Sequence, residues 1–326
     1  MDIVRWVKEW TLPAAMCTGA VLYLVFALVP QLDGAGTALG PLFAAVLPLL
    51  MFLVLFVTFC KVDFRALRPV GWHLWVGLFQ LLSIAVLMAL IVGCGLRGNS
   101  LVLTEALLMC VISPCATAAA VVTQKLGGSL EQTTTYTFLS NFLTALLVPV
   151  CFPMIEKSAD ITFMSAFTKI LYEVAVVLLA PMLLAYVVKH HMKRLHRRIV
   201  AIRDLSYYLW ACTLMIVTGT TVRNIVHAEA TVVLLTAIAL SALAVCIVQF
   251  AVGRFVGHYF GHTQEAGQAM GQKNTTFAIW LSSTYLNPLS SVGPGCYILW
   301  QNIINSIEIH VYSSSSTTSS GWKTQS

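Results

Sequence analysis

Lys273 is the residue of this chain whose surroundings most require a chemical explanation. Its segment, residues 269–280, carries Gln272, Lys273 and Asn274 near the middle of a long apolar stretch. A cation at the centre of a bilayer costs roughly 3 kcal/mol, so intramembrane charges persist where they face protein or a water-filled cavity. An ammonium offers one positive charge and three hydrogen-bond donors. We therefore expect Lys273 to be buried or to face a cavity, and to mark the functional site.

The composition places the chain in a membrane. Hydrophobic residues make up 58% of it, charged residues only 10%, and the mean hydropathy is +0.84. An ordinary soluble domain is about a quarter charged. The 9 cysteines stand singly, without the spacing of a zinc site or a disulfide framework. We expect no metal or other cofactor, and a first apolar run that is retained as a span rather than cleaved.

A helix needs about 20 apolar residues to cross the hydrocarbon. Ten segments meet this criterion: Leu12–Pro30, Pro41–Cys60, His73–Cys94, Leu101–Thr123, Gln132–Ile155, Ile170–Val188, Tyr207–Val226, Thr231–Val256, Ala266–Leu286 and Gly295–Tyr312. An even number of spans puts both termini on the same side of the membrane.

The basic residues of the loops indicate which side that is. With the loops assigned alternately, one side receives Arg5, Lys8, Lys61, Arg65, Arg68, Lys125, Lys189, Lys193, Arg194, Arg197, Arg198, Arg203, Arg254 and Lys323. The other side receives Arg97, Lys157, Lys169 and Arg223. Because basic loops stay in the cytoplasm, the pattern predicts a multi-pass protein of the plasma (inner) membrane with both termini cytoplasmic.

Two polar segments lie outside the spans. The basic run at residues 189–198 is explained as a determinant of topology, with binding of anionic lipid as the alternative. We expect the lipid bilayer as a partner and no nucleic acid. The serine-rich end, residues 313–326, has nothing to bury and is predicted to be a disordered tail.

Polar interruptions occur in two of the spans. The fourth contains residues 113–120, with Pro114, and the ninth contains the Lys273 segment. The interruptions lie five spans apart, as they would in two five-helix halves at residues 1–157 and 163–312. An odd number of spans per half forces the second half to insert upside down. Interrupted helices at corresponding positions of inverted halves indicate the binding site of a transporter.

Several stretches, in this order and spacing, resemble the bile acid:sodium symporter family. They are Met51–Leu53 leading to Lys61–Pro69, the interruption at Pro114, Gly271–Asn274 and Pro294–Asn302. The resemblance covers about residues 12–312. It implies an all-α membrane fold of ten transmembrane helices in two inverted five-helix repeats, divided into a panel and a core domain. The fourth and ninth helices would be broken and would cross, and sodium ions would accompany an organic anion.

The chain departs from the family at the implied sodium ligands. Ala119 and Ala120 stand where the family usually has a Ser-Asn pair, Ala269 stands in place of a glutamate, and Lys273 in place of a glutamine. A hard cation needs several oxygen ligands, preferably with an anionic one among them. We therefore expect the family's sodium coupling to be absent.

The remaining ligand positions predict a cation site with a surrogate ion. Gln80, Thr133 and Thr137 match the family pattern, and the Lys273 ammonium would take the place of the metal ion among them. The alternative is that Lys273 binds the substrate anion directly. Because burial disfavours the charged amine, proton coupling through Lys273 also stays open.

The resemblance implies a secondary transporter that moves a small organic anion by alternating access. Two half-helix amino termini would bring their positive dipole ends to the anion at mid-membrane. The residues expected to bind it are Thr117, Asn274, Thr275, Gln301 and Asn302. Gln301 stands where the family commonly has a histidine.

The sequence leaves two other functions open, a receptor or sensor and an arsenite exporter. A receptor or sensor could keep the fold of a transporter, and Cys115 beside Pro114 is similar to the Pro-Cys of arsenite exporters. An enzyme is not expected, because Asp33, Asp63, Asp160 and Asp204 fall in loops and His73, His258 and His262 near span ends. Glu105, Glu173 and Glu308 lie near helix ends, where we expect them to reach water.

Overall fold

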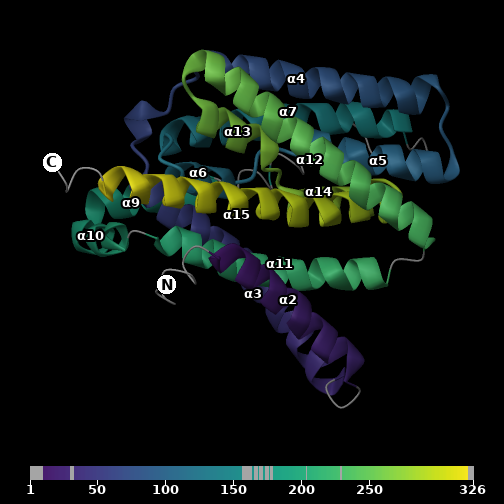
Figure 1. The fold of residues 1–326 in the computed structure, drawn as a ribbon, viewed down its shortest axis with the longest axis horizontal. Coiled ribbons are helices and arrows are strands. Elements are labelled where there is room, and N and C mark those ends of the chain that lie inside the picture. Colours follow the sequence, from purple (N-terminus) through teal and green to yellow (C-terminus); the bar gives the residue numbers. More distant parts are fainter. Residues whose placement is uncertain are drawn as a thin grey trace.

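The secondary structure of this computed structural model is helical (Figure 1). The structure describes residues 10–29, 33–155, 164, 168, 172, 176, 179–202, 204–227 and 230–321. The long helices that follow predicted spans are α2 (Thr11–Leu28), α3 (Asp33–Lys61), α4 (Gly71–Met88) with the π-helical turn η3 (Ala89–Gly93), α7 (Leu130–Ile155), α11 (Leu205–Val226) and α12 (Val232–Phe260). The other elements are α5 (Gly98–Ile112), α6 (Ala118–Lys125), α9 (Ala180–His191), α10 (Lys193–Ala201), α13 (Thr263–Gly271), α14 (Thr275–Tyr285), α15 (Val292–Gly321), η2 (Phe64–Ala66) and η5 (Pro288–Ser291).

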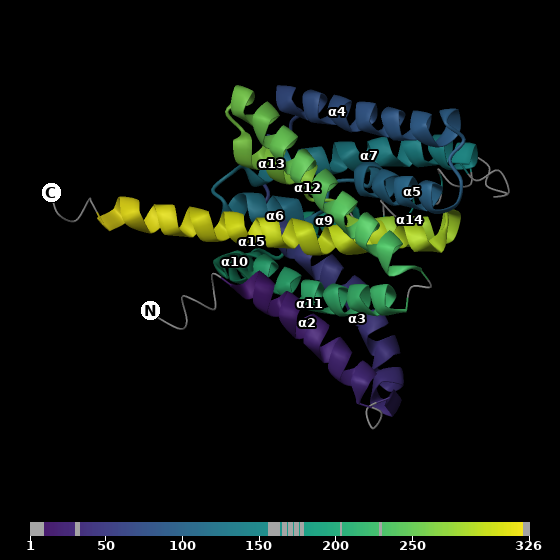
Figure 2. The same ribbon diagram turned by 45° about the vertical axis from the view of Figure 1, so that its right-hand side comes forward.

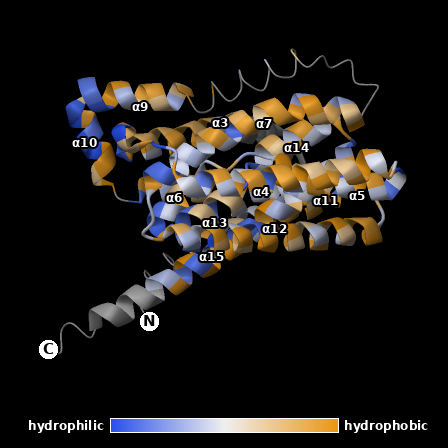
Figure 3. Ribbon diagram, turned by 90° about the horizontal axis from the view of Figure 1, so that it is seen from above, coloured by the Kyte–Doolittle hydropathy of each residue, from blue (hydrophilic) through white to orange (hydrophobic). Residues whose placement is uncertain are grey.

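Apolar surface covers much of the outside of the bundle. Helices α2, α4 with η3, α7, α11 and α12 are each long and apolar enough to cross a membrane. Leu28, Val232 and Val233 are 75%, 78% and 79% exposed, and Figure 3 shows hydrophobic residues along most of the outer helices. Such surface is stable against lipid and not against water. The chain is a multi-pass membrane protein.

Two predicted spans are broken helices. The fourth divides into α5 and α6 around Ser113–Thr117, and the ninth into α13 and α14 around Gln272–Asn274. Proline disfavours the helical region for the residue before it, and Ser113 accordingly has ψ 141°. Gln272 is likewise extended, at φ −90° and ψ 114°. The interruptions predicted from the polar residues are confirmed.

The helices form two packed groups. Helix α11 packs against α2 and α3, and α3 packs against α9. The second group contains α4, α5, α7, α12, α13 and α14, and α15 contacts members of both. Figure 2 shows α2, α3 and α11 on one side, α4 and α7 on the other, and α15 between them. The broken helices α5–α6 and α13–α14 therefore pack within one group, and α6 and α15 also contact the other group.

Some elements differ from the sequence predictions. Helix α15 continues to Gly321, so residues 313–321 are helical where we predicted a disordered tail. A helix that has already formed extends at the cost of fixing one residue per hydrogen bond, and this favours continuation. Helix α10 was not predicted at all. In the predicted span Ile170–Val188, residues 170–178 other than 172 and 176 lie outside the described residues, as does the boundary between the predicted repeats near residues 157–163.

The intramembrane carboxylates also need a correction. Glu105 is 1% exposed and accepts a hydrogen bond of 2.6 Å from Ser290 Oγ, so it does not reach water as we expected. Ser290 lies in η5, whose fold over the start of α5 the sequence did not reveal. Glu308 pairs with Arg254, whose side chain is 45% exposed. Glu173 lies outside the described residues.

Candidate functional site

The two helix breaks bind one another. Cys115 and Lys273 form an isolated antiparallel bridge. Ala116 N donates to Gln272 O at 2.9 Å, and Asn274 N donates to Pro114 O at 2.9 Å. Backbone groups that a continuous helix would satisfy internally are thus satisfied between the two breaks, as the absence of water in the bilayer core requires.

Lys273 lies inside this junction. Its side chain is 1% exposed, so the predicted burial is confirmed. Its Nζ donates to Val111 O at 3.3 Å, and Gln80 Nε2 donates to the same oxygen at 3.0 Å. Val111 is in the last turn of α5, where carbonyls lack partners within the helix and carry the negative end of its dipole. The ammonium therefore occupies a position that suits a cation.

The other carbonyls at the end of α5 are satisfied by polar side chains. Gln249 Nε2 donates to Cys110 O at 3.2 Å, Thr144 Oγ1 to Ile112 O at 2.8 Å, and Gln80 Nε2 also reaches Ser113 O at 3.4 Å. Tyr136 OH in turn donates to Gln80 Oε1 at 3.3 Å. The carbonyls at the end of α5 thus form an acceptor site. Gln80 of α4 and Lys273 of the α13–α14 break share it.

Gln301 of α15 holds the backbone of Lys273. Lys273 N donates to Gln301 Oε1 at 2.9 Å, and Gln301 Nε2 lies 3.4 Å from Lys273 O. One helical turn earlier, Tyr297 OH donates to Gly271 O at 2.8 Å. Helix α15 therefore holds the backbone of the unwound ninth helix at two points.

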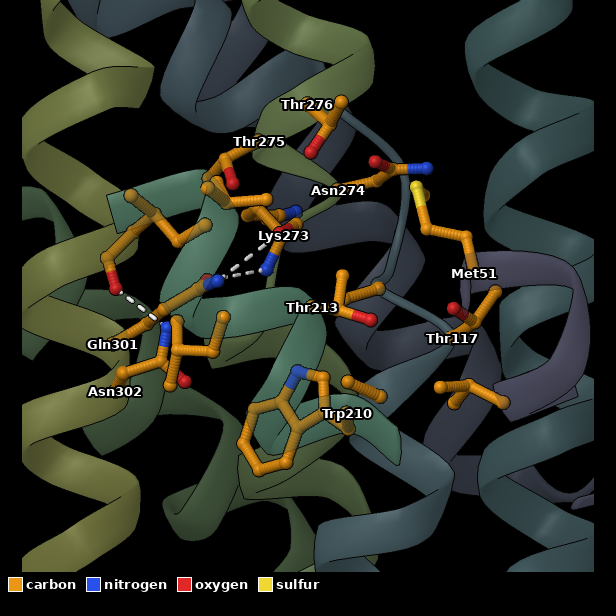
Figure 4. Close-up of a pocket in the computed structure, with 16 residues that line it drawn as sticks. Met51, Thr117, Trp210, Thr213, Lys273, Asn274, Thr275, Thr276, Gln301 and Asn302 are labelled. Carbon is orange, nitrogen blue, oxygen red and sulfur yellow. Dashed lines mark hydrogen bonds between the residues drawn. The ribbon is translucent and has the colours of Figure 1, made fainter. Parts of the chain in front are cut away.

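A cavity lies beside the junction, between the broken helices and the pair α3 and α11 (Figure 4). The volume of the cavity is about 70 Å³, and one bound water needs about 10–15 Å³ of such volume. A small anion with some water therefore fits. The cavity is lined by all five predicted substrate residues, Thr117, Asn274, Thr275, Gln301 and Asn302, and by Lys273.

The sequence did not indicate the opposite wall of the cavity. It includes Met51 and Val54 of α3 together with Trp210, Thr213, Leu214 and Val217 of α11. These are ordinary residues of apolar helices, and neither their type nor their spacing sets them apart. Only the packing of α11 against the broken helices brings them to the site.

Two helix amino termini face the cavity. Residues 116–118, at the start of α6, and residues 274–276, at the start of α14, are part of its lining. Asn274 caps α14, since its Oδ1 accepts from Phe277 N at 3.2 Å. The positive dipole ends of helices at such positions favour an anion.

The remaining predicted residues lie apart from the ammonium. Thr137 Oγ1 donates to Thr133 O at 2.9 Å and lies 3.5 Å from Cys115 Sγ, while Thr133 Oγ1 donates to Thr123 Oγ1 at 3.2 Å. No hydrogen bond in the described part of the chain joins either hydroxyl to Lys273 Nζ. The structure thus joins Gln80 and Lys273 at one carbonyl, whereas Thr133 and Thr137 have other hydrogen-bond partners.

The alanines at the implied sodium-ligand positions are tightly packed. Ala119 and Ala269 are both 0% exposed, and they belong to one apolar cluster with Cys115, Tyr136 and Met270. The hydroxyl and the carboxylate that the family resemblance implies at these two positions would bring oxygen atoms to this space. Methyl groups provide none, so this cluster supplies no side-chain ligand from either alanine to a hard cation.

The comparisons with known proteins agree with the geometry. A family model described as the Sodium Bile acid symporter family matches residues 48–228. The match contains the α5–α6 break and Gln80, and it ends before the Lys273 segment. No curated protein gives a match.

Proposed function

Because the chain belongs to the sodium bile acid symporter family, we propose that it is a secondary transporter that moves a small organic anion by alternating access. The cavity of Figure 4 carries this proposal. Two helix amino termini, the Lys273 segment and the amide of Asn302 surround it, and together they favour a carboxylate. Its apolar wall at Met51, Val54 and Trp210 suits the hydrocarbon part of such a molecule.

Transport without sodium is the second part of the proposal. Lys273 Nζ donates to a carbonyl at the end of α5 and shares it with Gln80. Apolar packing around Ala119 and Ala269 fills the space where oxygen ligands would stand. The ammonium supplies the positive charge that a mobile ion would otherwise bring, at the cost of a fixed buried charge.

Inverted repeats at residues 1–157 and 163–312 are the proposed basis of alternating access. The two breaks pair through an antiparallel bridge, as two copies related by an axis in the membrane plane would. The α2, α3 and α11 group would then act as the panel against which the broken helices move. Two of the residues that we assign to the cytoplasmic side lie close together, since Lys61 at the end of α3 donates to Ile202 O and Lys189 of α9 donates to Val62 O.

The arsenite-exporter alternative has less support. Cys115 is 0% exposed, its thiol lies against Ala116 O and Thr137, and it is not part of the cavity lining. A soft metalloid would need an accessible thiolate. The receptor alternative differs from a carrier only in flux, and the experiment below separates the two.

The test is uptake of radiolabelled organic anions by proteoliposomes that contain the purified protein. A panel of short monocarboxylates and keto acids is offered in sodium and in potassium buffer. We expect uptake of at least one compound at equal rates in both buffers. A steep sodium requirement would refute the role of Lys273. Saturable binding without flux would identify a receptor.

A further inference from the structure

Helix α10 turns the basic run at residues 189–198 into a structured surface. Helix α9 ends at His191, and Met192, with φ −116° and ψ 56°, redirects the chain into α10. Helix α10 contacts α9 and α3. In Figure 3 it forms a hydrophilic end beyond the hydrophobic α9.

Hydrogen bonds fix α10 against the end of α3. His196 Nε2 lies 2.8 Å from Cys60 O, and Lys61 Nζ donates to Ile202 O at 3.4 Å. Ile199 packs on the apolar cluster that contains Leu55, Phe59 and Cys60. The imidazole thus satisfies a carbonyl in the last turn of α3, which has no partner within that helix. These contacts set which face of α10 points outward.

The outward face is basic. Lys193, Arg194, Arg197 and Arg198 are all exposed and lie within one arc of the helix, since residues four apart share a face. The salt bridges of the described residues join Lys125 to Asp204, Arg254 to Glu308 and His262 to Glu265, so no described carboxylate forms a salt bridge with these four. Their charge is therefore accessible to an anion from outside the chain.

The adjacent face is apolar and exposed. Leu195 is 40% exposed and lies four residues before the anchored Ile199, on the same side of the helix. Met192 and Ile202, which flank the helix at its two ends, are 50% and 52% exposed. A loop that only determines topology needs charge and no such stripe. A basic face beside an apolar one is typical of a helix that lies in the plane of the membrane interface.

We propose that α10 is an interfacial helix that binds the phosphate groups of anionic lipids. Its basic face meets the headgroups, while Leu195 and Ile202 enter the boundary of the hydrocarbon. Each lost cation lowers the affinity about fivefold. Because α10 is fixed to α3, and Met51 and Val54 of α3 line the cavity, bound lipid also restrains one wall of the site. That consequence depends on the proposed transport, whereas lipid binding itself does not.

The test measures lipid retention by the full, purified chain in phosphatidylcholine nanodiscs doped with phosphatidylglycerol. Adding lipid to purified protein removes any effect of the charges on insertion. The charge variant carries Lys193→Gln, Arg194→Gln, Arg197→Gln and Arg198→Gln, the apolar variant carries Leu195→Gln and Ile202→Gln, and the control carries Arg65→Gln and Arg68→Gln, two exposed cations near η2.

We expect the charge variant to lose at least tenfold in selective retention of phosphatidylglycerol, the apolar variant to lose several-fold without any change of charge, and the control to keep most of it. Retention by the unaltered protein should fall steeply with salt. Equal retention by all variants, or full displacement by inorganic phosphate alone, would overturn the proposal. If the charge variant does not fold, the apolar variant and the salt dependence still decide.

Discussion

At the scale of single residues, Lys273 combines a cost to stability with a proposed role in function. Its buried ammonium is expensive in a bilayer, yet the acceptor it meets, Val111 O, already has Gln80 Nε2 at 3.0 Å. Replacing Lys273 with methionine, which has a similar length, therefore leaves that carbonyl satisfied. We expect Lys273→Met to keep or raise the unfolding temperature while it abolishes anion uptake. Thermal unfolding and proteoliposome uptake of the same preparation check this, and an active Lys273→Met variant would contradict it.

Neighbouring amides on α15 should separate support of the backbone from contact with the substrate. Gln301→Ala leaves the buried Lys273 N without its partner, at a cost of about 1–3 kcal/mol, whereas Lys273 O keeps its hydrogen bond from Thr275 N at 2.9 Å. Asn302 bonds Ile298 O of its own helix, and its Oδ1 has no partner among the described residues. We expect Gln301→Ala to lower the unfolding temperature clearly. For Asn302→Ala we expect a higher KM at nearly unchanged stability, and the reverse pattern would exchange the two roles.

Residue types and the family resemblance together predicted one wall of the cavity and missed the other. Gln301 and Asn302 came from the family resemblance, whereas Lys273 stood out by its type, because a charge in an apolar span is expensive. Trp210 and Thr213 did not, because such residues are common in membrane helices. Val111 could not be found either, since its contribution is a backbone carbonyl exposed only by the end of α5.

At the scale of helices, the close packing of α12 on α13 positions the broken ninth helix. A Cβ added at Gly253 would lie 2.5 Å from Ala266 O and 3.0 Å from Gly267 Cα, and backbone atoms cannot move aside cheaply. Small residues such as Gly253 at a helix interface let membrane helices approach closely. We expect Gly253→Ala to destabilise the protein by about 1–3 kcal/mol and to reduce uptake. Gly77→Ala is the matched control, since nothing lies within 4 Å of its added Cβ. Thermal unfolding of both variants decides, and equal effects would contradict the packing argument.

Helix breaks and spans could be predicted from sequence to different degrees. Hydropathy located the long spans, and the polar interruptions at Pro114 and Lys273 located both breaks. Helix α10 was missed because the basic run at residues 189–198 was interpreted as a short loop between two spans. The helix itself, Lys193–Ala201, is far shorter than a span. The pairing of the breaks depends on contacts between distant residues, such as Lys273 Nζ with Val111 O, which are 162 positions apart. Local sequence patterns do not encode such contacts.

At the scale of the whole molecule, the proposed fixed cation would decide how much charge each transport cycle moves. Lys273 is part of the chain and returns to its starting position at the end of a cycle, whatever path it takes. If no sodium ion travels with the substrate, the net charge moved is that of the organic anion alone. Uptake of a monovalent anion is therefore electrogenic. Moving one such charge across a potential of 100 mV changes its free energy by about 2.3 kcal/mol. This corresponds to a change of roughly 50-fold in the ratio of anion concentrations across the membrane.

This prediction can be checked with potassium gradients and valinomycin across the proteoliposome membrane. We expect an inside-positive potential to accumulate the anion and an inside-negative potential to exclude it, with no effect of a sodium gradient. In a cell with a negative interior, the same protein would then favour export. Accumulation that ignores the potential but follows a pH gradient would mean that a proton accompanies each anion. In that case the charge on Lys273 would be exchanged during the cycle rather than fixed.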